Sequence, residues 1–313
     1  MWADIWATLF NLNTVDAAIR LSTPIALAAL AGAFSERAGV VNIGLEGMLL
    51  SGAFAAVLGS FLSGNAWLGV LCGVLVGALL GALLALFTIR LEADHVVSGV
   101  GLNILSLGLT TWLMQVIWGS RGTSPSVAGI GRMQLPWLSE LPLLGRLLGA
   151  QSPFVYLMLL LVLASWWLMF KTPWGLRLRV IGEHPEAADS LGINISAIKY
   201  SCVIGAGALC GLGGAYLSLG NLTWFSVNMS AGRGYMALAA NIFGQWNPLG
   251  GFAASLLFSF ADAVQMRLQG LDIAVAHHLI QMLPYLLTIA VLAGAVLRSR
   301  PPAALGRHYR VQR

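Results

Sequence analysis

Long apolar runs divide this sequence, and they constrain its fold more than any other feature. A helix that crosses a bilayer needs about 20 largely apolar residues. Backbone groups in lipid must be hydrogen-bonded within the protein, so such runs predict membrane-spanning α-helices. The nine expected spans are Val15–Phe34, Val40–Leu62, Ala66–Ile89, Val96–Trp118, Phe154–Phe170, Ala197–Gly220, Gly234–Trp246, Leu249–Val264 and Val275–Leu297.

Charged residues are scarce. They make up 9% of the chain, and hydrophobic residues 58%, whereas a soluble domain carries about 25% charged residues. The chain therefore lacks the polar surface that water requires. We expect an all-α polytopic membrane protein with about 8–10 transmembrane helices, some of them broken or re-entrant. Gly234–Trp246 is too short for a full crossing and is the first candidate for such a helix.

One polar stretch, Lys171–Lys199, separates two apolar halves. A removed signal peptide is not expected, because the N-terminus lacks a basic region and a cleavage pattern. The proline-containing stretch Gly119–Ser152 is expected to form a folded external loop. We expect a single transmembrane domain, residues 1–313. Its expected parts are an interfacial segment (1–14), a first helical half (15–170), a cytoplasmic loop (171–199), a second helical half (200–297) and a cytoplasmic basic tail (298–313).

The polar stretch contains the pattern of a short helix, Pro185–Leu191. Pro185 suits a first helical position, where its missing N–H is not needed. Glu186 in the first turn interacts favourably with the helix dipole, and Gly192 can end the helix in a left-handed conformation. Two interpretations stay open. The stretch is a solvated connector, or its helix docks on a cytoplasmic partner through a small apolar face made of Ala187, Ala188 and Leu191.

Basic residues predict the orientation, because Lys and Arg are enriched in cytoplasmic loops. If the polar stretch faces the cytoplasm, eleven of the 17 basic residues lie inside and six outside. This favours a cytoplasmic C-terminus and an external N-terminus. The inside set is Arg37, Arg90, Lys171, Arg177, Arg179, Lys199, Arg298, Arg300, Arg307, Arg310 and Arg313; the outside set is Arg20, Arg121, Arg132, Arg146, Arg233 and Arg267.

Glycines recur at four-residue spacing, which lets helix backbones approach closely in lipid. Two further glycine-containing stretches, Ala38–Gly52 and Ala231–Gly251, also hold Asn and charged residues, one in each half. Interrupted apolar segments in matching halves are the best sequence pointer to a transport pathway at the bilayer midplane. The close-packing candidates are Gly69, Gly73, Gly77 and Gly81 in one run and Gly205, Gly207, Gly211, Gly213 and Gly214 in another.

Five polar residues are candidates for a substrate pathway: Asn42, Glu46, Asn103, Asn241 and Gln245. Glu46 is the most informative, because a carboxylate that faces lipid is costly. It lines the pathway or braces a helix break through backbone N–H groups. An interhelical hydrogen bond to Asn42 or Asn103 is an equally open interpretation. Asn241 and Gln245 follow on one face of the short seventh segment, where they can hydrogen-bond a solute.

Catalytic and metal-binding motifs are missing from the sequence. It has no Gly-Lys dipeptide, and hence no Walker A loop, and neither HExxH nor GxSxG. We therefore expect no enzyme, no catalytic residue and no cofactor. No metal site is expected, since His277 and His278 lack an accompanying Cys, Asp or Glu cluster. The net charge of +5 does not indicate nucleic acid, because the basic residues are dispersed at the ends of apolar runs.

Three blocks of the sequence are distinctive: SERAGVVNIGLEGMLLSGAF (Ser35–Phe54), TPWGLRLRVIGEHPEAADSLGINI (Thr172–Ile195) and AGRGYMALAANIFGQWNPLG (Ala231–Gly250). They closely resemble permease subunits of bacterial ABC importers. The branch is the one for nucleosides and simple sugars, related to ribose and branched-chain amino acid permeases. The blocks keep the order and spacing of that family, and the resemblance spans about Ser35 to Leu268.

The resemblance implies a role for the polar stretch. In that family the central cytoplasmic loop docks into a groove on a separate ATPase subunit. The matching residues are Gly175, Gly182, Glu183, Pro185, Glu186, Ala187, Ala188 and Gly192. The resemblance also implies a periplasmic or lipoprotein solute-binding protein and a second, non-identical permease, so that a heterodimer lies in the bacterial cytoplasmic (inner) membrane.

The expected solute is small and polar, and the resemblance favours a nucleoside. A simple sugar or riboflavin permease of the same family is an alternative. A stand-alone secondary transporter is the alternative from a different class, and it predicts uptake that an ion gradient drives without any ATPase.

Overall fold

A computed structural model describes residues 11–134, 147, 149–269, 282, 286, 289 and 300–309. Within these ranges the chain is helical apart from loops, an isolated bridge and one antiparallel pair of two-residue strands. The elements are α2 (Leu12–Arg37), α3 (Leu45–Ser63), α4 (Ala66–Ala85), the π-helix η1 (Leu86–Arg90), α5 (His95–Trp118), β1 (Met133–Gln134), β2 (Ala150–Gln151), α8 (Pro153–Lys171), α9 (Pro173–Glu183), α10 (Pro185–Ser190), α11 (Ile195–Ala215), the π-helix η2 (Tyr216–Leu222), α12 (Arg233–Phe243) and α13 (Pro248–Gln269).

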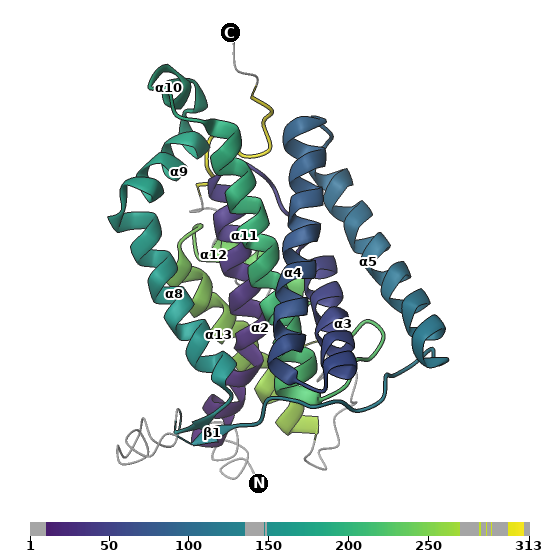
Figure 1. Cartoon of the computed structure of the whole chain (residues 1–313). Helices are drawn as coiled ribbons and strands as arrows, with labels where there is room; N and C mark the ends of the chain where they lie inside the picture. The colour runs from purple at the N-terminus through teal and green to yellow at the C-terminus, as the bar shows by residue number, and fades with distance from the viewer. Residues whose placement is uncertain are drawn as a thin grey trace.

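The long helices form one bundle (Figure 1). Helices α9 and α10 lie at one end of it, here named the α10 end, and β1 lies at the other, the β1 end. In the described part of the chain, seven helices are long and apolar enough to cross a membrane. They are α2, α3, α4 with η1, α5, α8, α11 with η2, and α13. The prediction of an all-α polytopic membrane protein is confirmed.

Seven of the nine expected spans correspond to these helices. The segment Gly234–Trp246 forms only the 11-residue helix α12, so the expectation that it is too short to cross is confirmed. Helix α2 begins at Leu12, inside the stretch expected to be interfacial. The expected span Val275–Leu297, most of the interfacial segment, and His277 and His278 lie outside the described residues.

Three helices form the centre of the bundle. In α2, α3 and α11, 78% of the most apolar stretch is buried within the described protein, against 39% or less in α4, α5, α8 and α13. Helices α3 and α4 both pack tightly on α11, and glycine makes this possible. A Cβ atom on Gly52 of α3 would lie 2.6 Å from the Cα of Gly211, and one on Gly81 of α4 would lie 2.6 Å from the carbonyl oxygen of Val203. The four-residue glycine spacing therefore marks real helix contacts.

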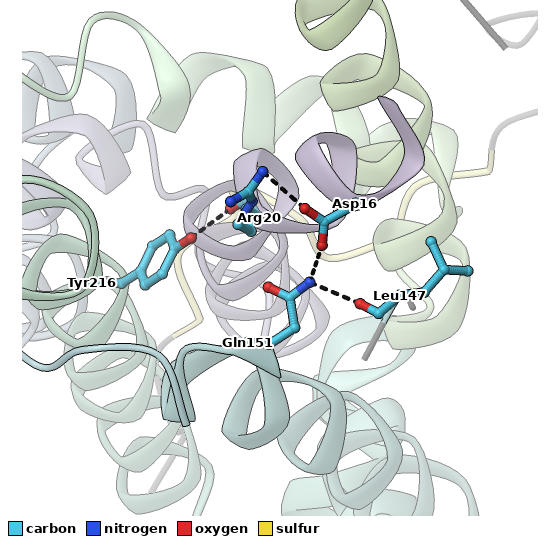
Figure 2. A network of polar contacts seen from close by, with 5 residues as sticks. All are labelled: Asp16, Arg20, Leu147, Gln151 and Tyr216. Carbon is cyan, nitrogen blue, oxygen red and sulfur yellow. Dashed lines mark hydrogen bonds and ion pairs between the residues drawn. The ribbon is translucent and has the colours of Figure 1, made fainter. Parts of the chain in front are cut away.

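A polar network connects α2, β2 and η2 at the β1 end (Figure 2). Arg20 Nη2 lies 2.9 Å from Asp16 Oδ2. The buried side-chain amide of Gln151 donates to Asp16 Oδ1 and, at 2.8 Å, to the carbonyl of Leu147. The Tyr216 hydroxyl donates to the carbonyl of Arg20 at 3.0 Å. These contacts fix the end of the bundle that is opposite α10.

Candidate functional site

Helix α3 begins well inside the bundle instead of continuing from α2. The seven residues between them, 38–44, are here named the α2–α3 link, and they run along the first turns of α5. Val41 N donates to Nδ1 of His95, the first residue of α5, at 3.1 Å. Asn103, eight residues further along α5, binds the carbonyl of Ile43 through Nδ2 at 2.9 Å. At 1.5 Å per residue, the start of α3 lies level with a point about 12 Å along α5 from His95.

Asn103 holds the start of α3. Its Oδ1 accepts from Gly47 N at 2.8 Å. Its Nδ2 donates both to Ile43 O and, at 3.0 Å, to the hydroxyl of Tyr235 on α12. This amide satisfies an N–H group of the first turn of α3, which has no partner within the helix. The same side chain brings α3, α5 and α12 together.

Glu46 joins the start of α3 to the start of α12. Its Oε1 accepts from Gly232 N at 2.8 Å, and its Oε2 accepts from Gly234 N at 2.6 Å. Gly232 has φ of 81° and precedes the first residue of α12. Only glycine fits at position 234, because a Cβ there would lie 2.5 Å from the Cα of Glu46. The carboxylate therefore caps α12, where the helix dipole favours negative charge. We name this contact the Glu46 cap.

The Glu46 cap bears on the two interpretations that the sequence left open. Glu46 is 8% exposed, and its hydrogen bonds go to backbone N–H groups at a helix break, not to Asn42 or Asn103. Asn42 is fully buried. Its Nδ2 lies 4.0 Å from the sulfur of Met48, and its Oδ1 has no hydrogen-bond partner among the described residues.

The other end of α12 is held by the last turn of α2. The carboxylate of Glu36, which is 4% exposed, accepts from Asn241 Nδ2 at 2.8 Å and from the indole N–H of Trp246. Arg37 donates from Nε to the carbonyl of Trp246 at 3.0 Å and from Nη2 to that of Gln245 at 3.1 Å. Residues Gln245 and Trp246 have φ of 55° and 53°, so this turn is left-handed. We name these contacts the Glu36 clamp.

The structure separates Asn241 from Gln245. Asn241 is fully buried and points to Glu36, whereas Gln245 is exposed in the turn that follows α12 at the α10 end. The expectation that both lie on one helix face is wrong, because α12 ends at Phe243 and the chain then turns. Sequence reasoning also missed Glu36 and Trp246. Glu36 stands beside Arg37 at the end of an apolar run, a position typical of an exposed interfacial charge.

Comparison with known proteins decides the family. Residues 14–292 match the model of a family described as branched-chain amino acid transport system / permease component. This chain belongs to that family of permeases. The resemblance in the three sequence blocks is thus confirmed.

Individual relatives match from end to end. NupC, a nucleoside ABC transporter permease protein of Lactococcus lactis subsp. cremoris (strain MG1363), is 39% identical over 92% of this permease and 93% of its own length. NupQ, a guanosine ABC transporter permease protein of Bacillus subtilis (strain 168), is 37% identical over 94% of this permease and 95% of its own length. The same two organisms each have a second, more distant match, NupB at 23% and NupP at 26% identity.

A solved structure shows the same fold. It is a metal-chelate type ABC transporter in an inward-facing conformation. The TM-score is 0.50 and the sequence identity 15%, over 91% of this permease and 85% of that chain.

In this permease the polar stretch folds into two helices, not one. Thr172 Oγ1 accepts from Gly175 N at 3.2 Å, so Thr172 caps α9. Gly175 packs on the carbonyl of Leu168 in α8, and Gly182 packs on the carbonyl of Arg37 in α2, with no room for a Cβ atom at either position. The Thr-Pro pair at the start, with Pro in the first turn, is the signal that predicts α9. These two glycines therefore serve packing.

Helix α10 is shorter than predicted and turns a different face outward. It spans Pro185–Ser190, and Gly192 has φ of 71°, as its place after the helix requires. Ala188 is fully buried beside Ile181 and Ile195, so the prediction that it belongs to the exposed face is wrong. The exposed coupling candidates are Glu183, Glu186, Ala187 and Gly192; Pro185 is half-buried. Leu191, 76% exposed, completes this surface.

Proposed function

We propose that this chain is the transmembrane permease subunit of an ATP-driven ABC importer and that its solute is a nucleoside. One observation carries the proposal, namely the 37–39% identity to NupC and NupQ over more than nine tenths of each chain. In this assignment a separate ATPase subunit hydrolyses ATP, and the permease is not itself an enzyme. NupB and NupP come from the same two organisms as NupC and NupQ, and this supports a second, non-identical permease partner.

The α10 end is proposed to face the cytoplasm. Basic residues at the ends of several helices favour this orientation: Arg37 ends α2, Arg90 ends η1 and Lys171 ends α8. The exposed surface of α10 then meets the ATPase, and the β1 end receives solute from a solute-binding protein. The resemblance of residues 172–195 to the docking loop of ABC importers supports this contact.

The contacts also offer a route from α10 to the middle of the bundle. Helix α10 follows α9 directly, and Gly182 of α9 packs on the last carbonyl of α2. The last turn of α2 carries the Glu36 clamp, and α12 leads from there to the Glu46 cap. A displacement of α10 is thus proposed to tilt α12 together with α2 and α3.

The α3–α12 region is proposed to shape the solute pathway. Glu46 and Asn103 hold the two helix starts in place. Asn42 and Asn241 each have a buried amide oxygen without a hydrogen-bond partner among the described residues. Buried acceptors of this kind are rarely left unsatisfied. We propose that these oxygens accept hydrogen bonds from water or from solute hydroxyls when the region opens.

The docking role of α10 is tested with a double variant in which Glu186 and Ala187 are each replaced by tryptophan. Uptake is measured in proteoliposomes that contain both permeases, the ATPase and the solute-binding protein. We expect the double variant to reach the membrane normally and to lose ATP-dependent nucleoside uptake. Leu163→Trp, at an exposed site in the middle of α8, is the control and should retain uptake. Normal uptake by the double variant refutes docking through α10, and ion-driven uptake without the ATPase supports the secondary-transporter alternative.

A further inference from the structure

Residues 302–309, here named the C-terminal strap, lie across α9 and α10. Ala304 N donates to the carbonyl of Gly182 at 2.8 Å. Ala303 N donates to Glu183 Oε2 at 3.3 Å. The hydroxyl of Tyr309 donates to Asp189 Oδ2 on α10 at 3.0 Å. A cavity of about 260 Å³ remains between the strap and the α9–α10 turn. The strap is thus bound to both α9 and α10.

The same strap is bound to the α2–α3 link. Gly306 N donates to the carbonyl of Gly39 at 3.0 Å, and Gly306 has φ of 74°, so the chain turns here. The ring centroids of His308 and His95 lie 5.0 Å apart. His95 in turn accepts a hydrogen bond from Val41 N through its Nδ1. The strap therefore touches the segment that leads, a few residues later, to the start of α3.

We propose that the C-terminal strap is a positioning element that carries the displacement of α10 directly to the α2–α3 link and so to the start of α3. The inference rests on the proposed function, because it needs a partner that moves α10. It adds a second connection beside the contact of α9 with α2. The strap differs from that contact because it connects α10 to the α2–α3 link without involving α12.

One bond in this connection can be removed without altering the backbone. The Tyr309–Asp189 hydrogen bond joins two side chains, whereas the bonds of residues 303, 304 and 306 come from backbone N–H groups. Desolvation, the hydrogen bond to Asp189, and the charges of Asp189 and Glu186 raise the pKa of Tyr309. The hydroxyl therefore keeps its proton at neutral pH and donates to the carboxylate.

The test uses the complete transporter in proteoliposomes and measures nucleosides taken up per ATP hydrolysed. Tyr309→Phe should lower this ratio at least about threefold, since a hydrogen bond to a charged group is lost. Asp189→Asn keeps an acceptor for Tyr309 and should stay near the wild-type ratio, whereas Asp189→Ala should match Tyr309→Phe. The double variant Tyr309→Phe with Asp189→Ala should be no worse than either single variant, because both remove the same bond.

Other outcomes overturn the inference. If Asp189→Ala lowers the ratio and Tyr309→Phe does not, Asp189 acts on the ATPase itself and the strap transmits nothing. An unchanged ratio in both Tyr309→Phe and Asp189→Ala also refutes transmission through the strap. So does a double variant in which the losses of the two single variants add up. A wild-type transporter without ATP-dependent uptake overturns the proposed function, and the inference falls with it. Wild-type uptake combined with insensitive variants refutes the strap alone.

Discussion

Removing the charge of Glu46 should destabilise the protein far more than the same change at an exposed helix cap. Glu46 accepts backbone hydrogen bonds of 2.8 and 2.6 Å from Gly232 and Gly234, and it is 8% exposed. Glu46→Gln keeps one acceptor oxygen but turns an NH₂ group toward the other N–H. One charge-assisted bond is lost, worth about 1.5–3 kcal/mol, and a buried donor is left without a partner, at a cost of about 1–3 kcal/mol. Together these give an expected loss of about 2.5–6 kcal/mol in the free energy of unfolding.

Asp94→Asn is the matched control. Asp94 caps α5, and its Oδ1 accepts from Val96 N and Val97 N, each at 2.9 Å. The two carboxylates thus make the same kind of contact, but Asp94 makes it at an exposed helix start. Since Asn caps an exposed helix as well as Asp does, the control should change stability by less than about 0.5 kcal/mol.

The assay is thermal unfolding of each purified variant in detergent micelles. Glu46→Gln should lower the midpoint on the order of 5–10 °C, whereas Asp94→Asn should leave it nearly unchanged. Equal midpoints for the two variants would refute the reasoning, because burial of the cap would then contribute nothing.

Two further changes test the packing and the Glu36 clamp by the same measurement. Gly207→Ala should lower the midpoint strongly, since the new Cβ meets the carbonyl of Gly77, whereas Gly205→Ala has nothing within 4 Å and should be neutral or slightly stabilising; similar losses in both variants would contradict the close approach of α4 and α11. Trp246→Phe removes the indole N–H that binds Glu36 and should cost about 1–3 kcal/mol. The exposed Trp224→Phe should cost little, and a Trp246 variant as stable as that control would show that the clamp does not depend on the indole.

Much of the fold follows from the sequence because length and apolarity decide where a helix can cross a bilayer. The spans were predictable for that reason, and the close approach at Gly211 was predictable from the spacing of the glycines. The Glu46 contact was predictable in kind, since an acid inside an apolar segment needs a partner, but not in detail. Its partners are backbone N–H groups 186 and 188 residues away, and residue type carries no information about them.

The polar stretch and the Glu36 clamp show the limit of such reasoning. Ala188 looks like part of an exposed face by spacing, yet it is buried because the cluster around Ile181 and Ile195 lies beneath α10. Glu36 looks like an interfacial charge, yet Asn241 and Trp246 fold over it. In each case a segment distant in the chain decides the burial, and single-sequence patterns do not contain that segment.

The anchoring of α12 at both ends has a consequence for biogenesis. Glu36 and Glu46 are synthesised about 190 to 210 residues before the N–H groups that donate hydrogen bonds to them. The segments that carry these two carboxylates leave the translocon before their native donors have been made. Until then the carboxylates are exposed to lipid, which is energetically costly. A gene split at the central loop would leave both carboxylates in one fragment and all their donors in the other, so we expect the fragments to need co-expression to accumulate.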